Sequence, residues 1–201
     1  MKYIRPGLLF LLLVLSVPAV AQDLEGLVSG CDECHGNQGV SSWNNVPTIA
    51  GQPSAYIRAA LRSYQQWGRP CIKTGYPEGG TSRPKTDMCK ISEELTYDEI
   101  DAIGKHYEAQ TFIGAKQPFD LAKAELGGDL HEIHCETCHS MGGTIAARGP
   151  ILAGQWTPYL RAAIKQALSG EHLVPPVMET RLTDFSTQEI EALTNFYASQ
   201  Q

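Results

Sequence analysis

Two short runs of this sequence bring together side chains that form covalent bonds and bind metals. Cys31-Asp-Glu-Cys-His35 and Cys135-Glu-Thr-Cys-His139 each hold two thiols three residues apart, followed directly by a histidine. This Cys-x-x-Cys-His pattern is typical of c-type haem attachment. Two thiols on one side of a helical turn can form thioethers with the two vinyl groups of a porphyrin, which holds the histidine beneath the iron. The sequence therefore predicts two haem c groups, attached through Cys31, Cys34, Cys135 and Cys138, with proximal iron ligands His35 and His139.

A single run of this kind would also fit a structural zinc site or a redox-active dithiol. A closed zinc site needs four ligands, and neither run has a second cysteine pair near it in the sequence. A thioredoxin-like dithiol is expected next to a βαβ pattern, which this sequence does not predict. Two matches at equivalent places of a repeat favour haem.

The repeat covers most of the chain. Pro47-Thr-Ile-Ala-Gly-Gln52 and Tyr56-Ile-Arg-Ala-Ala60 recur 103 residues later as Pro150-Ile-Leu-Ala-Gly-Gln155 and Tyr159-Leu-Arg-Ala-Ala163. The two cysteine motifs follow the same order with an offset of 104 residues. We therefore interpret the chain as a tandem duplication. Apolar residues at helical spacing predict an all-α fold.

Each copy is expected to contain three main helices. An opening helix leads into the cysteine motif, to about Cys34 in the first copy and over 118–138 in the second. Middle helices are expected at 56–67 and 159–169, and a loop carrying one methionine then leads to a closing helix. A capping box, Ser186 with Glu189, fits the second closing helix better than any equivalent fits the first. The predicted domains are 22–112 and 118–201, with a linker at 113–117.

A methionine is the expected second axial ligand of each iron. Met141 follows His139 too closely to reach the opposite face of the haem. Met88 and Met178 each lie 19 residues before a matched tyrosine, Tyr107 or Tyr197. Equivalent positions predict one distal methionine per haem, and this ligand pair favours electron transfer over binding of small ligands. Two alternatives stay open, the Cys89 thiolate in the first domain and His172 in the second.

The two cysteines outside the haem motifs bracket an insertion. Between the matched proline and the methionine, the first half has 13 more residues than the second. Cys71 and Cys89 lie at the ends of this insertion, 18 residues apart. We predict a disulfide between them, which would stabilise the fold by roughly 3 kcal/mol through chain entropy.

Further matched residues are candidates for contacts with the haem. Tyr56 and Tyr159, with Arg58 and Arg161, could hydrogen-bond the haem propionates. Pro47 and Pro150 stand where a carbonyl group could receive the N–H of the proximal histidine and set its orientation. All three pairs occupy matched positions of the repeat: Pro47 with Pro150, Tyr56 with Tyr159, and Arg58 with Arg161.

The N-terminal residues predict export. Lys2 and Arg5 precede an apolar run over 8–17, and Ala19-Val-Ala21 is a typical cleavage site, so we expect a signal peptide at 1–21 and a periplasmic protein. The run is shorter than the roughly 20 residues of a membrane span, which makes an uncleaved anchor the rival interpretation. No membrane span is expected after cleavage. Loss of Lys2 and Arg5 would change the formal charge from −6 to −8. Such acidity argues against nucleic acid and favours a partner with a basic face.

These motifs resemble a known family. The paired Ala-Gly-Gln blocks and the methionine spacing resemble the dihaem cytochrome c4 family, which implies two tandem class I cytochrome c domains. In the second half, Ala115-Lys-Gln-Pro-Phe-Asp120, the run from Ile151 to Leu160, and Phe196-Tyr-Ala-Ser-Gln-Gln201 resemble the cytochrome subunit of flavocytochrome c sulfide dehydrogenase. The insertion bracketed by the two extra cysteines departs from that subunit's pattern.

The resemblance implies an electron-transfer subunit without catalytic residues of its own. A separate FAD flavoprotein would oxidise sulfide and pass single electrons to the haems, and a downstream cytochrome or oxidase would receive them. This chain lacks a Gly-x-Gly-x-x-Gly turn for a flavin nucleotide. The alternative is a freely diffusing carrier between respiratory complexes. A haem enzyme with an open iron site is a third hypothesis, which the two methionines disfavour.

Overall fold

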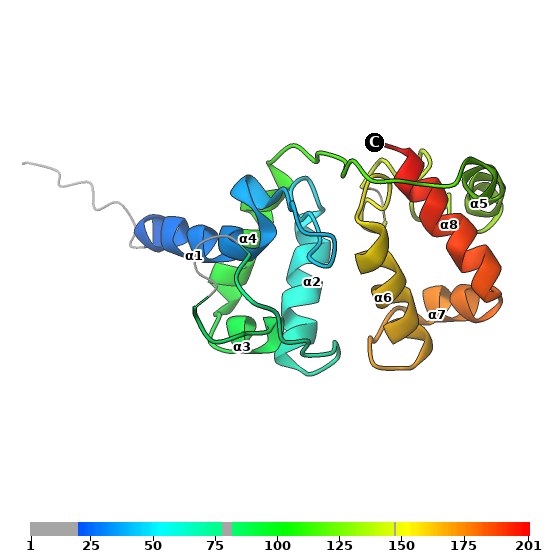
Figure 1. Ribbon diagram of the computed structural model, residues 1–201. Helices are drawn as coiled ribbons and strands as arrows, with labels where there is room; N and C mark the ends of the chain where they lie inside the picture. Colours follow the sequence, from blue (N-terminus) through cyan, green and yellow to red (C-terminus); the bar gives the residue numbers. More distant parts are fainter. Residues whose placement is uncertain (1–19, 78–81, 147) are drawn as a thin grey trace, which may run out of the picture.

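The helices form two groups that stand side by side (Figure 1). The computed structural model describes residues 20–77, 82–146 and 148–201. In these residues the chain forms eight α-helices and one 3-10 turn, with a single antiparallel bridge between Thr74 and Thr86 as its only β-pairing. The all-α prediction is confirmed. The predicted signal peptide falls almost wholly on residues 1–19, outside the described part.

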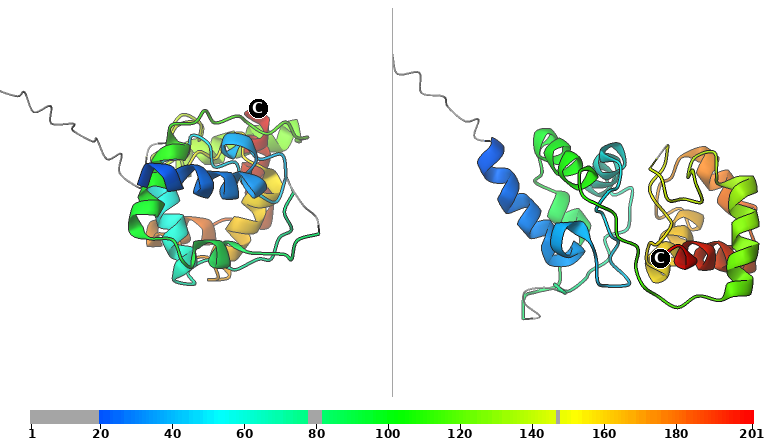
Figure 2. Two further views of the ribbon diagram at one scale, coloured as in Figure 1. Left: turned by 90° about the vertical axis from the view of Figure 1, so that its left-hand side faces the viewer. Right: turned by 90° about the horizontal axis from the view of Figure 1, so that it is seen from above.

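Each group repeats the same order of helices. The first group consists of α1 (Val20–His35), the 3-10 turn η1 (Asn37–Gly39), α2 (Ser54–Gln65), α3 (Met88–Ser92) and α4 (Tyr97–Glu108). The second consists of α5 (Leu121–His134), α6 (Thr157–Leu168), α7 (Pro176–Thr183) and α8 (Thr187–Ser199). The middle helices α2 and α6 lie on the inner sides, where the two groups face each other (Figure 1). An extended segment from α4 to α5 connects the groups (Figure 2).

Three local features differ from the prediction. The methionines lie on short helices, Met88 at the start of α3 and Met178 in α7, instead of in loops. The first closing helix has a complete capping box, Thr96 with Glu99, as good as that of the second. Helix α5 stops at His134, before the cysteine motif that it was expected to include. The N–H groups of Cys135 and Glu136 both bond to the His131 carbonyl, which ends the regular i to i−4 pattern.

A small apolar core lies inside each group. In the first it contains Ile57, Leu61, Ile100, Ile103 and Tyr107, and in the second Leu160, Leu193 and Tyr197. The matched tyrosines are both buried, and each binds the opening helix through its hydroxyl group. Tyr107 donates to Asp32 at 2.8 Å, and the Tyr197 hydroxyl is 3.0 Å from Nδ1 of the buried His131. The repeat therefore ties its first and last helices together in the same way twice.

The insertion of the first half is closed at its base. Cys71 and Cys89 form a disulfide, and the Thr74–Thr86 bridge lies inside the loop that it closes. Both sulfur atoms approach the carbonyl oxygen of Arg69 within 4.0 Å. The disulfide thus fixes the backbone of Arg69 relative to helix α3.

No helix in the described ranges is both long and apolar enough to cross a membrane.

The contact between α5 and α8 depends on a glycine. A Cβ atom on Gly127 would collide with the carbonyl group of Ala192, whereas one on Gly128 would lie 3.4 Å from the Phe196 ring, an ordinary contact. We expect Gly127→Ala to destabilise the protein by about 1–3 kcal/mol through overpacking. The matched control Gly128→Ala should leave stability unchanged or raise it, since alanine favours helix. Thermal unfolding of both holoproteins tests this, and equal melting temperatures would contradict the close helix contact.

Candidate haem sites

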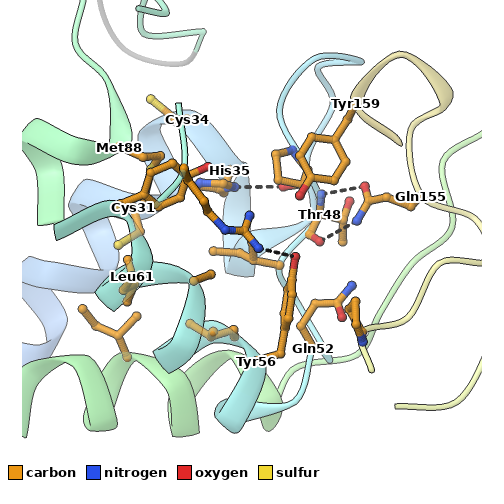
Figure 3. Close-up of a pocket in the computed structure, with 18 of the residues that line it drawn as sticks. Cys31, Cys34, His35, Thr48, Gln52, Tyr56, Leu61, Met88, Gln155 and Tyr159 are labelled. Atoms are coloured by element: carbon orange, nitrogen blue, oxygen red, sulfur yellow. Dashed lines mark hydrogen bonds between the residues drawn. The ribbon is translucent and has the colours of Figure 1, made fainter. Parts of the chain in front are cut away.

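A large pocket opens beside the first cysteine motif (Figure 3). Its walls include Cys31, Cys34, His35 and Met88, together with apolar residues of α2 and α4. It contains about 1050 Å³ of space outside the protein atoms, part of it open to solvent. Six of its lining residues come from the second half: Pro150, Ile151, Leu152, Gln155, Tyr159 and Leu160. Both domains therefore build the first pocket.

A hydrogen bond to the backbone fixes the orientation of the His35 ring. Helix α1 carries the whole first motif, and Nδ1 of His35 lies 2.8 Å from the carbonyl oxygen of Pro47. Because a carbonyl oxygen only accepts hydrogen bonds, Nδ1 carries the proton and Nε2 keeps its lone pair. Burial lowers the pKa of His35, which keeps the ring neutral. A neutral imidazole with a free Nε2 is the form that binds iron.

The second motif repeats this arrangement on a different backbone. His139 lies in the turns after α5, and its Nδ1 is 2.9 Å from the carbonyl oxygen of Pro150. Burial lowers the pKa of His139 as well. Gly149 packs against this ring so closely that a Cβ atom there would lie 2.8 Å from Nδ1. In the sequence, the only sign of that role is a glycine directly before the matched proline.

The thiols do not have the properties of a redox-active pair. Burial raises the pKa of Cys31 to about 11 and also raises the pKa values of Cys34 and Cys135. Reactive Cys-x-x-Cys sites have lowered thiol pKa values instead. Cys89 is bonded to Cys71, so its sulfur is not a free thiolate.

The three methionines have different surroundings. Met88 lines the pocket together with His35 and packs against the first core. Met178 is half-buried in α7, which packs on α6. Met141 is 66% exposed. Only Met88 is brought next to a predicted proximal histidine by the pocket itself, so ligation by Met178 rests on the repeat.

Arg69 is a pocket residue that the sequence analysis missed. Its guanidinium lies over the rings of Tyr56 and Tyr64, and Nη2 is 3.5 Å from the Tyr56 hydroxyl. Tyr159 reaches the same region from the second domain, and burial raises its pKa well above the usual value. Within the described ranges, no carboxylate oxygen lies within 4.0 Å of Arg69. A cation in a pocket without an anionic partner fits a ligand that brings carboxylates, as haem does with its propionates.

The arginines named from the sequence are engaged elsewhere. Arg58 pairs with Asp101 on α4, and Nε of Arg161 lies 3.4 Å from the Thr194 hydroxyl. Neither lines the pocket. Arg58 and Arg161 were predicted because they occupy matched positions of the repeat. Arg69, which lines the pocket, has no arginine at the matched position of the second half. Counting 103 residues on from Arg69 gives His172.

His172 lies at the junction of the domains. Its pKa is lowered to about 4 by burial and by the charge of Arg69, so the ring is neutral at pH 7. The neighbouring Leu173 N–H donates to the Gly68 carbonyl of the first domain at 2.8 Å. This position favours a role in packing over the alternative role as an iron ligand.

Comparisons with known proteins agree with the predicted cofactor. No family model matches the chain. It is 27% identical over 206 residues to cytochrome c4 from Stutzerimonas stutzeri, and the match covers 94% of this chain and 96% of that protein.

Two solved structures share the fold. Reduced recombinant cytochrome c4 from Pseudomonas stutzeri superposes with a TM-score of 0.70 at 24% identity, over 90% of this chain and 98% of that chain. The thiosulfate dehydrogenase TsdBA from Marichromatium purpuratum gives 0.67 at 22% identity, over 85% of this chain and 36% of that chain. The chain therefore consists of two tandem cytochrome c domains like those of cytochrome c4, and its cofactors are two haem c groups.

Proposed function

We propose that this protein is an exported electron carrier in which each iron has one histidine and one methionine ligand. The observation that supports it most is that His35 and Met88 line one pocket, while His139 and Met178 hold the equivalent places in the repeat. Haem c supplies a one-electron couple, and methionine as second ligand raises its potential. With both axial positions filled by protein, no site is left open for a substrate. The chain itself would then catalyse no reaction.

Arg69, Tyr56 and Tyr159 would hold the propionates of the first haem. The guanidinium is a permanent charge with five donors and no carboxylate partner within reach among the described residues. Both tyrosines line the same pocket and come from opposite domains. The proposed propionate-binding residues include both tyrosines that the sequence predicted, whereas Arg69 takes the place of Arg58 and Arg161.

A second candidate function is narrower: an electron-accepting subunit of a periplasmic sulfur-compound dehydrogenase. The runs 115–120, 151–160 and 196–201 resemble the cytochrome subunit of a flavin-dependent sulfide dehydrogenase, and the similarly folded TsdBA is a thiosulfate dehydrogenase. The side chains of Trp67 and Leu173 are both exposed, and the Leu173 N–H bonds to the Gly68 carbonyl where the domains join. Exposed apolar side chains are a feature of protein contact surfaces. The flavoprotein would carry FAD, and a cytochrome or oxidase would take the electrons onward.

Gentle purification of the tagged protein from the periplasm separates the two candidates. A dehydrogenase subunit is expected to bring near-stoichiometric flavin, and sulfide should reduce its haems. Reduction by thiosulfate without flavin would point to a different dehydrogenase. Purification of haem protein alone, unreduced by either compound, would leave the freely diffusing carrier.

The axial ligands are tested by Met88→Leu and Met178→Leu, with Met141→Leu as the matched control. Each of the first two should lower the midpoint potential of one haem by on the order of 0.1 V, within the range of about 0.8 V that axial ligands cover. The opened iron should also bind carbon monoxide when reduced. The exposed Met141 should change neither property. If the three variants titrate alike, methionine is not the second ligand.

The role of Arg69 is tested by Arg69→Gln against Arg62→Gln, an exposed arginine of the same domain that does not line the pocket. A positive charge near the haem stabilises the reduced state, which carries one more electron. Arg69→Gln is therefore expected to lower the midpoint potential of the first haem, and Arg62→Gln to leave it unchanged. Equal midpoint potentials of the first haem in the two variants, measured by redox titration, would contradict the role of Arg69 in binding the propionates.

A further inference from the structure

Two buried glutamines join the domains in a reciprocal way. Gln155 accepts from the Thr48 N–H at 3.0 Å and donates to the Thr48 carbonyl at 2.9 Å. Gln52 accepts from the Ile151 N–H at 2.9 Å and donates to the Ile151 carbonyl at 3.0 Å. Both glutamines are at most 3% exposed. They are the last residues of the repeated Ala-Gly-Gln blocks. Each binds one residue of the other domain, and these two partners, Thr48 and Ile151, occupy matched positions of the repeat.

These contacts adjoin the bonds that hold the proximal histidines. The Thr48 N–H and the Pro47 carbonyl belong to one peptide group, and that carbonyl receives the His35 Nδ1 proton. The peptide between Pro150 and Ile151 joins His139 to Gln52 in the same manner. One planar peptide therefore separates each predicted proximal histidine from a glutamine of the opposite domain. Figure 3 shows the set formed by His35, Thr48 and Gln155.

We propose that Gln155 and Gln52 are positioning residues that tune the haem of the other domain, Gln155 through His35 and Gln52 through His139. This inference rests on the proposed role of both histidines as proximal ligands. An acceptor bonded to a peptide N–H polarises the peptide group, so its carbonyl becomes a stronger acceptor, by about 10–30% per bond. A stronger acceptor at Nδ1 makes the imidazole a more basic ligand. The more basic ligand favours oxidised iron.

The direction of the effect follows from this chain of bonds. Loss of the Gln155 acceptor weakens the Pro47 carbonyl as an acceptor and makes His35 less basic. The oxidised state of the first haem then loses stabilisation, and its potential rises. A substitution in the second domain thus acts on the haem of the first, and a substitution of Gln52 acts on the second. A general loosening of the interface would not produce this exchange of domains.

The test is a redox titration of the holoproteins, followed by NMR with each haem assigned to its domain. Gln155→Met keeps the length of the side chain and removes its polar atoms. It is expected to shift the first haem about threefold toward the reduced state, about 28 mV at 59 mV per tenfold change, and to leave the second haem in place. Gln52→Met should shift the second haem by the same amount; because Gln52 also lines the first pocket, the first haem is the readout for Gln155→Met only.

The control removes a different hydrogen bond between the domains. Trp156 follows Gln155 directly, and its indole N–H donates to the Ser41 carbonyl at 3.0 Å. Trp156→Phe loses that bond but leaves both glutamines in place, so both potentials should stay as in the wild type. Equal shifts in all three variants, a Gln155→Met shift confined to the second haem, or an unchanged second haem in Gln52→Met would overturn the tuning role.

A second measurement covers the case in which Gln155→Met and Gln52→Met do not fold. In the reduced wild-type holoprotein, the Thr48 and Ile151 amide protons should exchange at least about 100-fold more slowly than unprotected amides. Fast exchange at either would overturn the inference. A wild type whose haems lack histidine ligation would overturn the proposed function instead, so the two failures can be told apart.

Discussion

One hydrogen bond, from the Nδ1 of each predicted proximal histidine to a proline carbonyl, determines how the rest of the site is arranged. It fixes which ring nitrogen is free and where that nitrogen points. Proline suits this position because it has no N–H, and its ring restricts the backbone that presents the carbonyl. In both domains, the loop after the cysteine motif folds back so that the proline carbonyl oxygen lies next to Nδ1 of the histidine ring. In the second domain the fit is so close that only glycine is accommodated at position 149.

The same backbone segment also forms the contact between the domains. Thr48 and Ile151 follow the prolines, and their peptide groups pair with the glutamines across the junction. Side chains of the second domain therefore complete the first pocket. Buried polar groups need partners, and here each domain provides the partners that the other lacks. Separating the domains would expose the pocket and break four hydrogen bonds between glutamine side chains and the backbone.

Much of this arrangement could be predicted from the sequence, because it depends on spacing. The Cys-x-x-Cys-His motifs, the repeated middle helices and the prolines behind the histidines all follow from residue types at fixed distances. The complete capping box of Thr96 with Glu99 was not predicted, because the start of the first closing helix resembles that of the second only loosely. Arg69 was missed because matching the two halves selects what they share, and this residue is arginine in one half only. The glutamines were visible as a repeat, but their partners lie 99 and 107 residues away, a pairing that only the folded chain reveals.

Duplication alone would produce two equal sites, so any difference between the haems must come from positions where the halves differ. The insertion supplies one such difference: its disulfide holds the backbone of Arg69 beside the first pocket. The matched position in the second half is His172, which burial and Arg69 keep neutral at pH 7. A permanent charge on one side of the junction thus faces an uncharged ring on the other. Because a cation stabilises the reduced state, the two sites are electrostatically unequal although their proximal hydrogen bonds are nearly identical.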